Sequence, residues 1–273
     1  MSLKLLYITN KTEIASLADR AGIDRIFIDL EIKGKEERQG HLNTVISRHS
    51  TKDIKKIKDV LTFSQLLVRI NPINKESKKE IDLVIEGKAD IIMLPMFSTA
   101  DEVREFIRLV DKRAKTCLLL ETAAAAVRID EILDVPGIDE IHIGLNDLHI
   151  DMKLTFMFEL LSCGFIDYLA QKIKAHNIPF GFGGIARIGY GELPAEYIIT
   201  EHYRIGSCMA ILSRSFCDAN KRSADEVIED FTLGIKRIRE FEKSVSQLSD
   251  SEFRENHARV ISAVKKITEK KAY

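Results

Sequence analysis

Eight short apolar runs recur along the chain, and segments with helical spacing lie between most of them. The runs are rich in Ile, Leu, Val and Phe with little polar alternation, which is typical of parallel strands buried on both faces. Strands that alternate with helices indicate βαβ units, and eight such units close a (β/α)₈ barrel. The 273 residues suit one barrel, typically of about 250 residues, with a short extension. The predicted strands are Leu3–Ile8, Arg25–Glu31, Gln65–Ile70, Asp90–Pro95, Thr116–Glu121, Glu140–Gly144, Pro179–Gly183 and Cys208–Ser213.

The sequence has no linker or low-complexity tract, so we predict a single barrel domain over residues 1–273. Residues 224–273 follow the last predicted strand and are expected to form a C-terminal helical extension. Ser223-x-x-Glu226 has the pattern of a capping box, and a last helix is expected over Ser251–Glu269. The apolar stripes of this extension either pack on the same barrel or belong to helices exchanged between subunits. The other predicted helices are Thr12–Ala21, Ser77–Glu86, Ala100–Asp111, Thr122–Leu133 and Pro194–Tyr203.

Composition narrows the class of partner. The net charge of −1 gives no reason to expect a nucleic acid or an acidic membrane surface as a partner. The four cysteines show no zinc-binding spacing, and Cys117 and Cys208 lie in apolar runs where a reduced core thiol is expected. The N-terminal apolar stretch is too short for a signal peptide. We therefore expect a cytoplasmic protein that acts on a small molecule.

Two carboxylates close consecutive strand-like runs. Glu121 ends one run, and Asp147 follows the next, beside Gly144 and Asn146. The C-terminal ends of barrel strands converge on one mouth, and paired carboxylates there can hold Mg²⁺ or Mn²⁺. We expect Glu121 and Asp147 as metal ligands, with Gly144 and Asn146 at the substrate. The alternative is that each carboxylate caps the following helix or forms an ion pair.

A charged group at the end of the third run needs an anionic partner. Arg69 would be costly to bury alone, and its planar guanidinium is suited to a substrate carboxylate. Asp29 and Glu31 alternate on the second run and therefore face the same side. In one interpretation they orient Arg69 and the waters bound to a metal, with Asp29 at the substrate and Glu31 in catalysis. In the other they form a polar layer that closes the barrel, with a salt bridge to Arg69.

Two loop features complete the candidate site. Ile32–Thr51 is a long charged connection after the second strand, and such connections are often functional. His41 and His49 lie within it, and either could serve as a general base. Gly183 and Gly184 end the seventh run, where backbone N–H groups often reach an anion, although a tight turn explains them equally.

Taken together, these segments resemble the HpcH/HpaI aldolase/citrate lyase family. That resemblance implies a TIM barrel of the phosphoenolpyruvate/pyruvate-binding type. It implies a divalent cation (Mg²⁺, Mn²⁺ or Co²⁺) on Glu121 and Asp147, with Arg69 at the substrate carboxylate or enolate oxygen. It also implies a homo-oligomer with an exchanged C-terminal helix. The segments that carry it are Ile28-Asp-Leu-Glu31, Leu67-Val-Arg-Ile-Asn71, Asp90-Ile-Ile-Met-Leu-Pro-Met96, Leu118-Leu-Leu-Glu121 and Ile143-Gly-Leu-Asn-Asp-Leu148.

The sequence departs from the family at one position that matters for the chemistry. Short-chain aldolases of the family carry an acid/base His directly after the D-x-E segment, and here Ile32 stands there. The acidic residue of the citrate lyase type is missing too. The following loop must supply a substitute, and His49 is preferred because it can both donate and accept a proton. The other candidates are Lys35, Arg38 and Arg48.

The sequence thus predicts a metal-dependent aldolase that forms a pyruvate-like enolate, with catalytic Arg69, His49 and Glu31. Two rivals remain open. One is cleavage of a hydroxyacyl-CoA thioester, as in the citrate lyase branch. The other is a barrel that binds a metal or an anion without catalysis, which the missing His after Glu31 favours.

Overall fold

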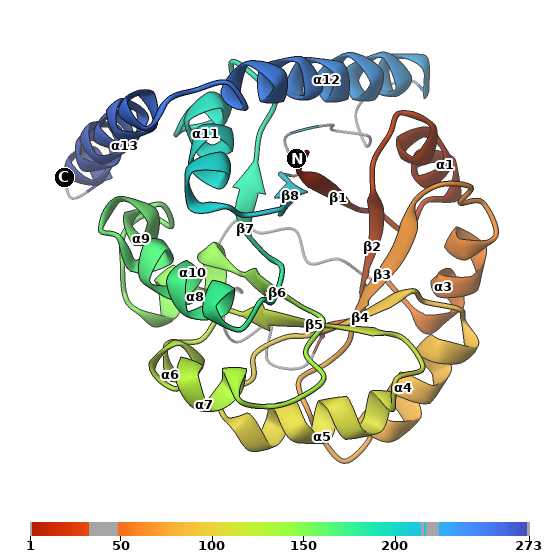
Figure 1. Ribbon diagram of the computed structural model, residues 1–273. Coiled ribbons are helices and arrows are strands. Elements are labelled where there is room, and N and C mark those ends of the chain that lie inside the picture. The colour runs from red at the N-terminus through yellow and green to blue at the C-terminus, as the bar shows by residue number, and fades with distance from the viewer. Residues whose placement is uncertain (1, 33–48, 214–215, 217–223, 272–273) are drawn as a thin grey trace.

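The computed structural model describes residues 2–32, 49–213, 216 and 224–271, and its centre is a closed barrel of parallel strands (Figure 1). Each strand pairs with the next, and β1 closes the barrel against β8. Helices surround the strands, which confirms the predicted TIM barrel. All eight predicted strands are present, with ends within two residues of the expected positions. The strands are β1 (Lys4–Ile8), β2 (Arg25–Asp29), β3 (Gln65–Arg69), β4 (Ile91–Leu94), β5 (Lys115–Leu120), β6 (Glu140–Ile143), β7 (Phe180–Ile185) and β8 (Met209–Leu212).

The helices follow the prediction less closely than the strands. The segment predicted as one helix, Thr122–Leu133, is two helices that meet at Arg128, whose backbone leaves the helical region. Ser223, the predicted capping residue, lies outside the described residues. The helices are α1 (Thr12–Arg20), α3 (Thr51–Lys58), α4 (Ser77–Glu86), α5 (Ala100–Val110), α6 (Ala123–Val127), α7 (Ile129–Leu133), α8 (Leu145–Asp151), α9 (Glu159–Ser162), α10 (Phe165–Ala175), α11 (Ala195–Ile205), α12 (Ala224–Val245) and α13 (Asp250–Lys271). None of the helices in the described part of the chain is long and apolar enough to cross a bilayer.

The barrel interior is apolar in its middle, and a buried ion pair lies at the end where the strands begin. Leu6, Phe27 and Leu119 belong to the inner cluster, which also includes the predicted core thiol of Cys117. A guanidinium nitrogen of Arg25 lies 2.9 Å from a carboxylate oxygen of Glu140, and both residues are buried. A buried charge needs such a partner, because an isolated one would be costly to desolvate.

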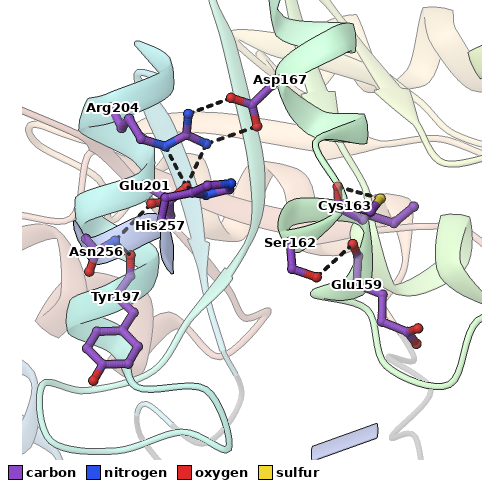
Figure 2. Close-up of polar contacts among 10 residues, drawn as sticks. Glu159, Ser162, Cys163, Asp167, Tyr197, Glu201, Arg204, Asn256 and His257 are labelled. Carbon is purple, nitrogen blue, oxygen red and sulfur yellow. Dashed lines mark hydrogen bonds and ion pairs between the residues drawn. The ribbon is translucent and has the colours of Figure 1, made fainter. Parts of the chain in front are cut away.

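The two C-terminal helices lie on the outside of the barrel (Figure 1). α12 packs against α1 and α11, and α13 packs against α9 and α11 of the same chain. Figure 2 shows the polar contacts that fix α13: the buried carboxylate of Glu201 accepts hydrogen bonds from Arg204, Asn256 and His257. Arg204 also pairs with Asp167 on α10. Exchange of these helices between subunits stays a prediction.

The first residues of the chain are tied to α12. Leu3 N–H donates to Glu242 at 2.6 Å, and Leu3 C=O accepts from Arg239 at 2.7 Å. Arg239 also forms ion pairs with Asp24 and Glu242. These contacts hold α12 against the start of β1.

Candidate active site

Four of the predicted site residues come from the carboxyl ends of four strands. Asp29 and Arg69 are the last residues of β2 and β3 and lie opposite each other in register. Glu121 directly follows β5, and Asp147 lies in the first turn of α8, which follows β6. Because side chains alternate along a strand, the first three lie one layer above the apolar interior. They therefore line the mouth at which barrel enzymes carry their active sites.

The guanidinium of Arg69 is held by two carboxylates, those of Asp29 and Glu31. Its Nε and Nη2 atoms donate to the two oxygens of Asp29 at 2.9 and 2.8 Å, and Nη2 lies 3.3 Å from Glu31 Oε2. The guanidinium also lies over the ring of Phe27, with its central carbon 5.6 Å from the ring centre. The salt bridge that the sequence left open is thus present. Burial disfavours the charged form, but Asp29, Glu31 and Glu121 outweigh burial and keep the pKa of Arg69 above its ordinary value.

Glu121 is almost completely buried, with 2% of its surface exposed. One carboxylate oxygen accepts the backbone N–H of Met96 at 3.2 Å, and Met96 adopts a left-handed backbone with φ of 52°. A strained non-glycine residue of this kind is often found at a functional site. Glu121 does not cap the following helix, because the Thr122 side chain accepts the N–H of Ala125 in that role. The alternative of a helix-capping Glu121 is therefore wrong.

Acidic side chains gather around Glu121. Burial raises the pKa of its carboxyl group, Arg69 opposes this, and the nearby charges of Asp147 and Glu31 raise it further. A divalent cation bound at Glu121 would favour its ionised form, and oxygen donors suit Mg²⁺ or Mn²⁺. The donor set therefore fits the predicted metal.

The predicted site supplies two carboxylate ligands. Among the described residues, no group of three or more His, Cys, Asp or Glu side chains has metal-binding geometry. Glu121 and Asp147 would hold a cation whose remaining positions fall to water and substrate oxygens, as is common for Mg²⁺.

Gly144 has a steric reason to lack a side chain. A Cβ atom there would lie 2.9 Å from both Cβ and Oε2 of Glu121 and 3.2 Å from Leu119. The glycine therefore lets the chain after β6 pass directly beside the buried carboxylate. Asn146, the other predicted substrate contact on this segment, is exposed in the first turn of α8. Contact of either residue with substrate stays a prediction.

The two glycines at the end of β7 differ. Gly183 has a φ of 52° and would place a Cβ 2.8 Å from Leu145, so its backbone and its packing both favour glycine. Its carbonyl oxygen lies 3.3 Å from the ring Nε2 of His142 in the barrel interior. Gly184 has no such restriction, since the nearest atom to its Cβ position would be 3.6 Å away. Their predicted role at an anion remains open.

His49 lies at the β1 edge of β2. Its Nδ1 accepts the backbone N–H of Asp29 at 3.0 Å, so a neutral ring carries its proton on Nε2. The predicted base is thus held beside the backbone of a residue that orients Arg69. The remaining loop candidates, at positions 35, 38, 41 and 48, lie outside the described residues.

Sequence reasoning missed one polar residue of this mouth. Asn71 follows β3 by two residues, and its side chain contacts the backbone of Leu30 and Ile32. The residue stood in the quoted Val-Arg-Ile-Asn segment, but its contacts depend on how β3 turns away from β2. The signal that could have identified Asn71 is a polar side chain just after an apolar strand.

Comparison with known proteins agrees with this fold. The family model for HpcH/HpaI aldolase/citrate lyase matches residues 4–160, which is more than half of the chain. The structure resembles the HpcH/HpaI aldolase of Desulfitobacterium hafniense DCB-2, with a TM-score of 0.62 and 16% identity over 88% of this chain and 93% of that one. It also resembles an HpcH/HpaI aldolase/citrate lyase family protein of Burkholderia cenocepacia J2315, with a TM-score of 0.61 and 13% identity over 78% and 88% of the two chains. No curated protein sequence matches the chain.

Proposed function

Because the chain belongs to the HpcH/HpaI aldolase/citrate lyase family, and so is of the lyase type, we propose that it is a divalent-metal-dependent aldolase acting on a 2-oxo acid. The observation that carries the proposal is the partly buried Arg69, aligned by Asp29 and Glu31 and placed in the electrostatic field of Glu121. A preorganised guanidinium at this mouth is suited to stabilise a developing enolate oxygen.

Glu121 and Asp147 would hold the cation, which supplies electrostatic stabilisation to the substrate's carboxylate and 2-oxo oxygens. Arg69 would contact the same end of the substrate with the guanidinium N–H groups that Asp29 and Glu31 do not engage. Glu31 and Asp29 hold that guanidinium in one orientation, so little reorganisation is needed as charge develops. Because Gly144 has no Cβ, the Glu121 side chain can lie directly against the chain that follows β6.

The reaction needs a base near the hydroxyl of a 4-hydroxy-2-oxo acid. In cleavage, that hydroxyl loses its proton, the bond between C3 and C4 breaks, and an aldehyde leaves. The electron pair moves into the enolate of pyruvate, which is then protonated at C3. His49 is the proposed acid/base because its ring is held beside Asp29; with the proton on Nε2 the ring can donate as it stands, and to accept the hydroxyl proton Nδ1 must first release the N–H of Asp29.

The proposed enzyme acts on a small carboxylate in the cytoplasm as a homo-oligomer. The small carboxylate follows from the substrate class of a 2-oxo acid aldolase. The compartment and the assembly are proposals carried over from the sequence and from the family resemblance.

The test is deuterium exchange at the methyl group of pyruvate, followed by NMR in D₂O with Mg²⁺, with Mn²⁺ and with a chelator. Metal-dependent exchange supports enolate formation, and Glu121→Gln should abolish it while the fold is retained. Exchange at the wild-type rate in Glu121→Gln would contradict the assignment. Metal binding by calorimetry without any exchange would favour thioester cleavage or a non-catalytic barrel instead.

A further inference from the structure

β2 and β3 end together at Asp29 and Arg69, two residues beyond the last paired residue of β1. The chain that follows β2, from Leu30 to Ile32, stays beside the chain that follows β3. On the β1 side, His49 Nδ1 accepts the N–H of Asp29 in place of a strand carbonyl. On the β3 side, the last ladder bond is Leu30 N–H to Arg69 C=O at 2.9 Å.

The side-chain amide of Asn71 continues that ladder. In a regular parallel pair, the backbone of residue 71 would accept from Ile32 and donate to Leu30. Instead, Asn71 Oδ1 accepts the N–H of Ile32 at 3.0 Å, and Nδ2 donates to the C=O of Leu30 at 3.3 Å. The side chain thus supplies the donor and the acceptor that a peptide group would have offered.

Glu80 of α4 fixes the orientation of this amide. Its carboxylate accepts Asn71 Nδ2 at 2.7 Å and the backbone N–H of Asn71 at 3.3 Å. An amide can rotate by half a turn and exchange its donor and acceptor, but a carboxylate accepts only from the nitrogen. Glu80 therefore selects the orientation in which the oxygen of Asn71 faces Ile32.

We propose that Asn71, oriented by Glu80, is a positioning residue for the reaction at this mouth. By fixing Leu30 and Ile32, it holds the intervening Glu31 side chain toward Arg69. Of the three contacts that the Arg69 guanidinium makes with Asp29 and Glu31, the one with Glu31 is the longest, at 3.3 Å. It is therefore the contact most sensitive to the position of this backbone. The inference rests on the proposed function for its catalytic part and on hydrogen bonds alone for its structural part.

The structural part is tested by amide hydrogen exchange in the intact protein. In Asn71→Ala, the Ile32 amide loses its acceptor, and we expect its exchange to become at least about tenfold faster. Asn177→Asp, which changes an exposed amide on a loop at the opposite end of the barrel, should leave the exchange of Ile32 unaffected. An unchanged Ile32 amide in Asn71→Ala would overturn the proposal.

The catalytic part is tested with pyruvate methyl exchange. Asn71→Asp removes the donor to Leu30 and places a second carboxylate against Glu80, so we expect the catalytic rate to fall about ten- to a hundredfold. Metal affinity by calorimetry should stay within about twofold of wild type, because Asn71 is not among the proposed ligands. Glu80→Gln keeps one acceptor and should retain more rate than Glu80→Ala.

The outcomes separate this inference from the proposed function. A wild-type catalytic rate in Asn71→Asp would overturn the positioning role, as would equal losses of rate in the two Glu80 variants. A wild-type protein without any exchange activity would refute the proposed function and the catalytic part with it. Amide exchange at Ile32 would still decide whether Asn71 holds the end of β2.

Discussion

Arg69 has two possible partners at once, the carboxylates that hold it and the anion that it would bind. The bidentate contact with Asp29 uses Nε and Nη2. A lysine cannot reproduce this planar contact, because its ammonium group is a compact charge on a flexible stem. We therefore expect the planar geometry of the Arg69 guanidinium, and not only its charge, to affect the reaction rate.

We predict that Arg69→Lys keeps the fold but lowers pyruvate methyl exchange by about a hundredfold, the scale of losing one preorganised donor. Steady-state kinetics in D₂O would measure the loss, and circular dichroism would check the fold. Arg108→Lys is a matched control, since Arg108 forms an exposed ion pair with Glu105 on the outer surface of α5. Equal rates for the Arg69 variant and wild type would show that this contact is structural only.

Gly144 and Gly184 allow a paired test at the same mouth. Gly144→Ala would force a Cβ to within 2.9 Å of Glu121, whereas Gly184→Ala would meet nothing closer than 3.6 Å. We predict that the first variant weakens Mn²⁺ binding by about ten- to a hundredfold, because the displaced carboxylate no longer holds its orientation. Titration calorimetry of both variants would measure this. Similar affinities for the two variants would argue against Glu121 as a ligand.

At the scale of elements, β6 carries a histidine into the barrel interior. His142 is buried, its Nε2 contacts Gly183 C=O, and its Nδ1 has no hydrogen-bond partner among the described residues. Burial is the main cause that lowers the pKa of His142 to about 4, and the charge of Arg25 adds to it. The folded protein therefore takes up this proton less readily than the unfolded chain.

A lowered histidine pKa makes stability depend on pH in one direction. The contribution is complete above the unfolded pKa of about 6.5 and is lost as the pH falls toward 4, by at most about 3 kcal/mol. We predict that the free energy of unfolding, measured with urea, declines in this way as the pH falls. The His142→Leu variant should show a smaller decline with pH. His202, whose pKa burial also lowers, would retain part of it. The exposed His176→Leu variant should keep the full decline, and identical slopes in all three proteins would contradict the prediction.

The strands were the predictable part of the fold because most of them bury a run of apolar residues on both faces. The short helices were not, since α8 and α9 are too brief to show a periodic stripe. α10 does show one, with Ile166, Leu169, Ala170 and Ile173 buried, and could have been predicted from that spacing. Element type thus follows from sequence where burial is continuous, and fails where tertiary contacts set a short turn.

The candidate site divides in the same way. Arg69 and Glu121 could be predicted because a charge at the end of an apolar strand is unusual in itself. The contacts of Asn71 and Met96 could not, because they depend on where β3 and β4 leave the barrel. Long-range contacts of this kind leave no periodic signal in a single sequence.

At the scale of the whole molecule, the Glu201 network fixes the last helix (Figure 2). Its carboxylate is fully buried and accepts from Asn256 and His257 of α13 at 2.9 Å each. We predict that Glu201→Ala lowers the free energy of unfolding by about 3 to 5 kcal/mol, because it leaves buried polar partners uncompensated. Urea denaturation would measure this. Glu255→Ala removes an exposed carboxylate from α13 and should cost less than about 1 kcal/mol; equal losses would contradict the assigned role of Glu201.

The contacts of Leu3 have a consequence for the order of folding. Its N–H and C=O bond to Glu242 and Arg239, which lie 239 and 236 positions later in the chain. During synthesis, β1 leaves the ribosome long before those partners exist. Contacts between residues so distant in sequence are slow to form, because a long loop must be ordered first. The contacts that join the start of β1 to α12 are therefore expected to form late, only after α12 has emerged.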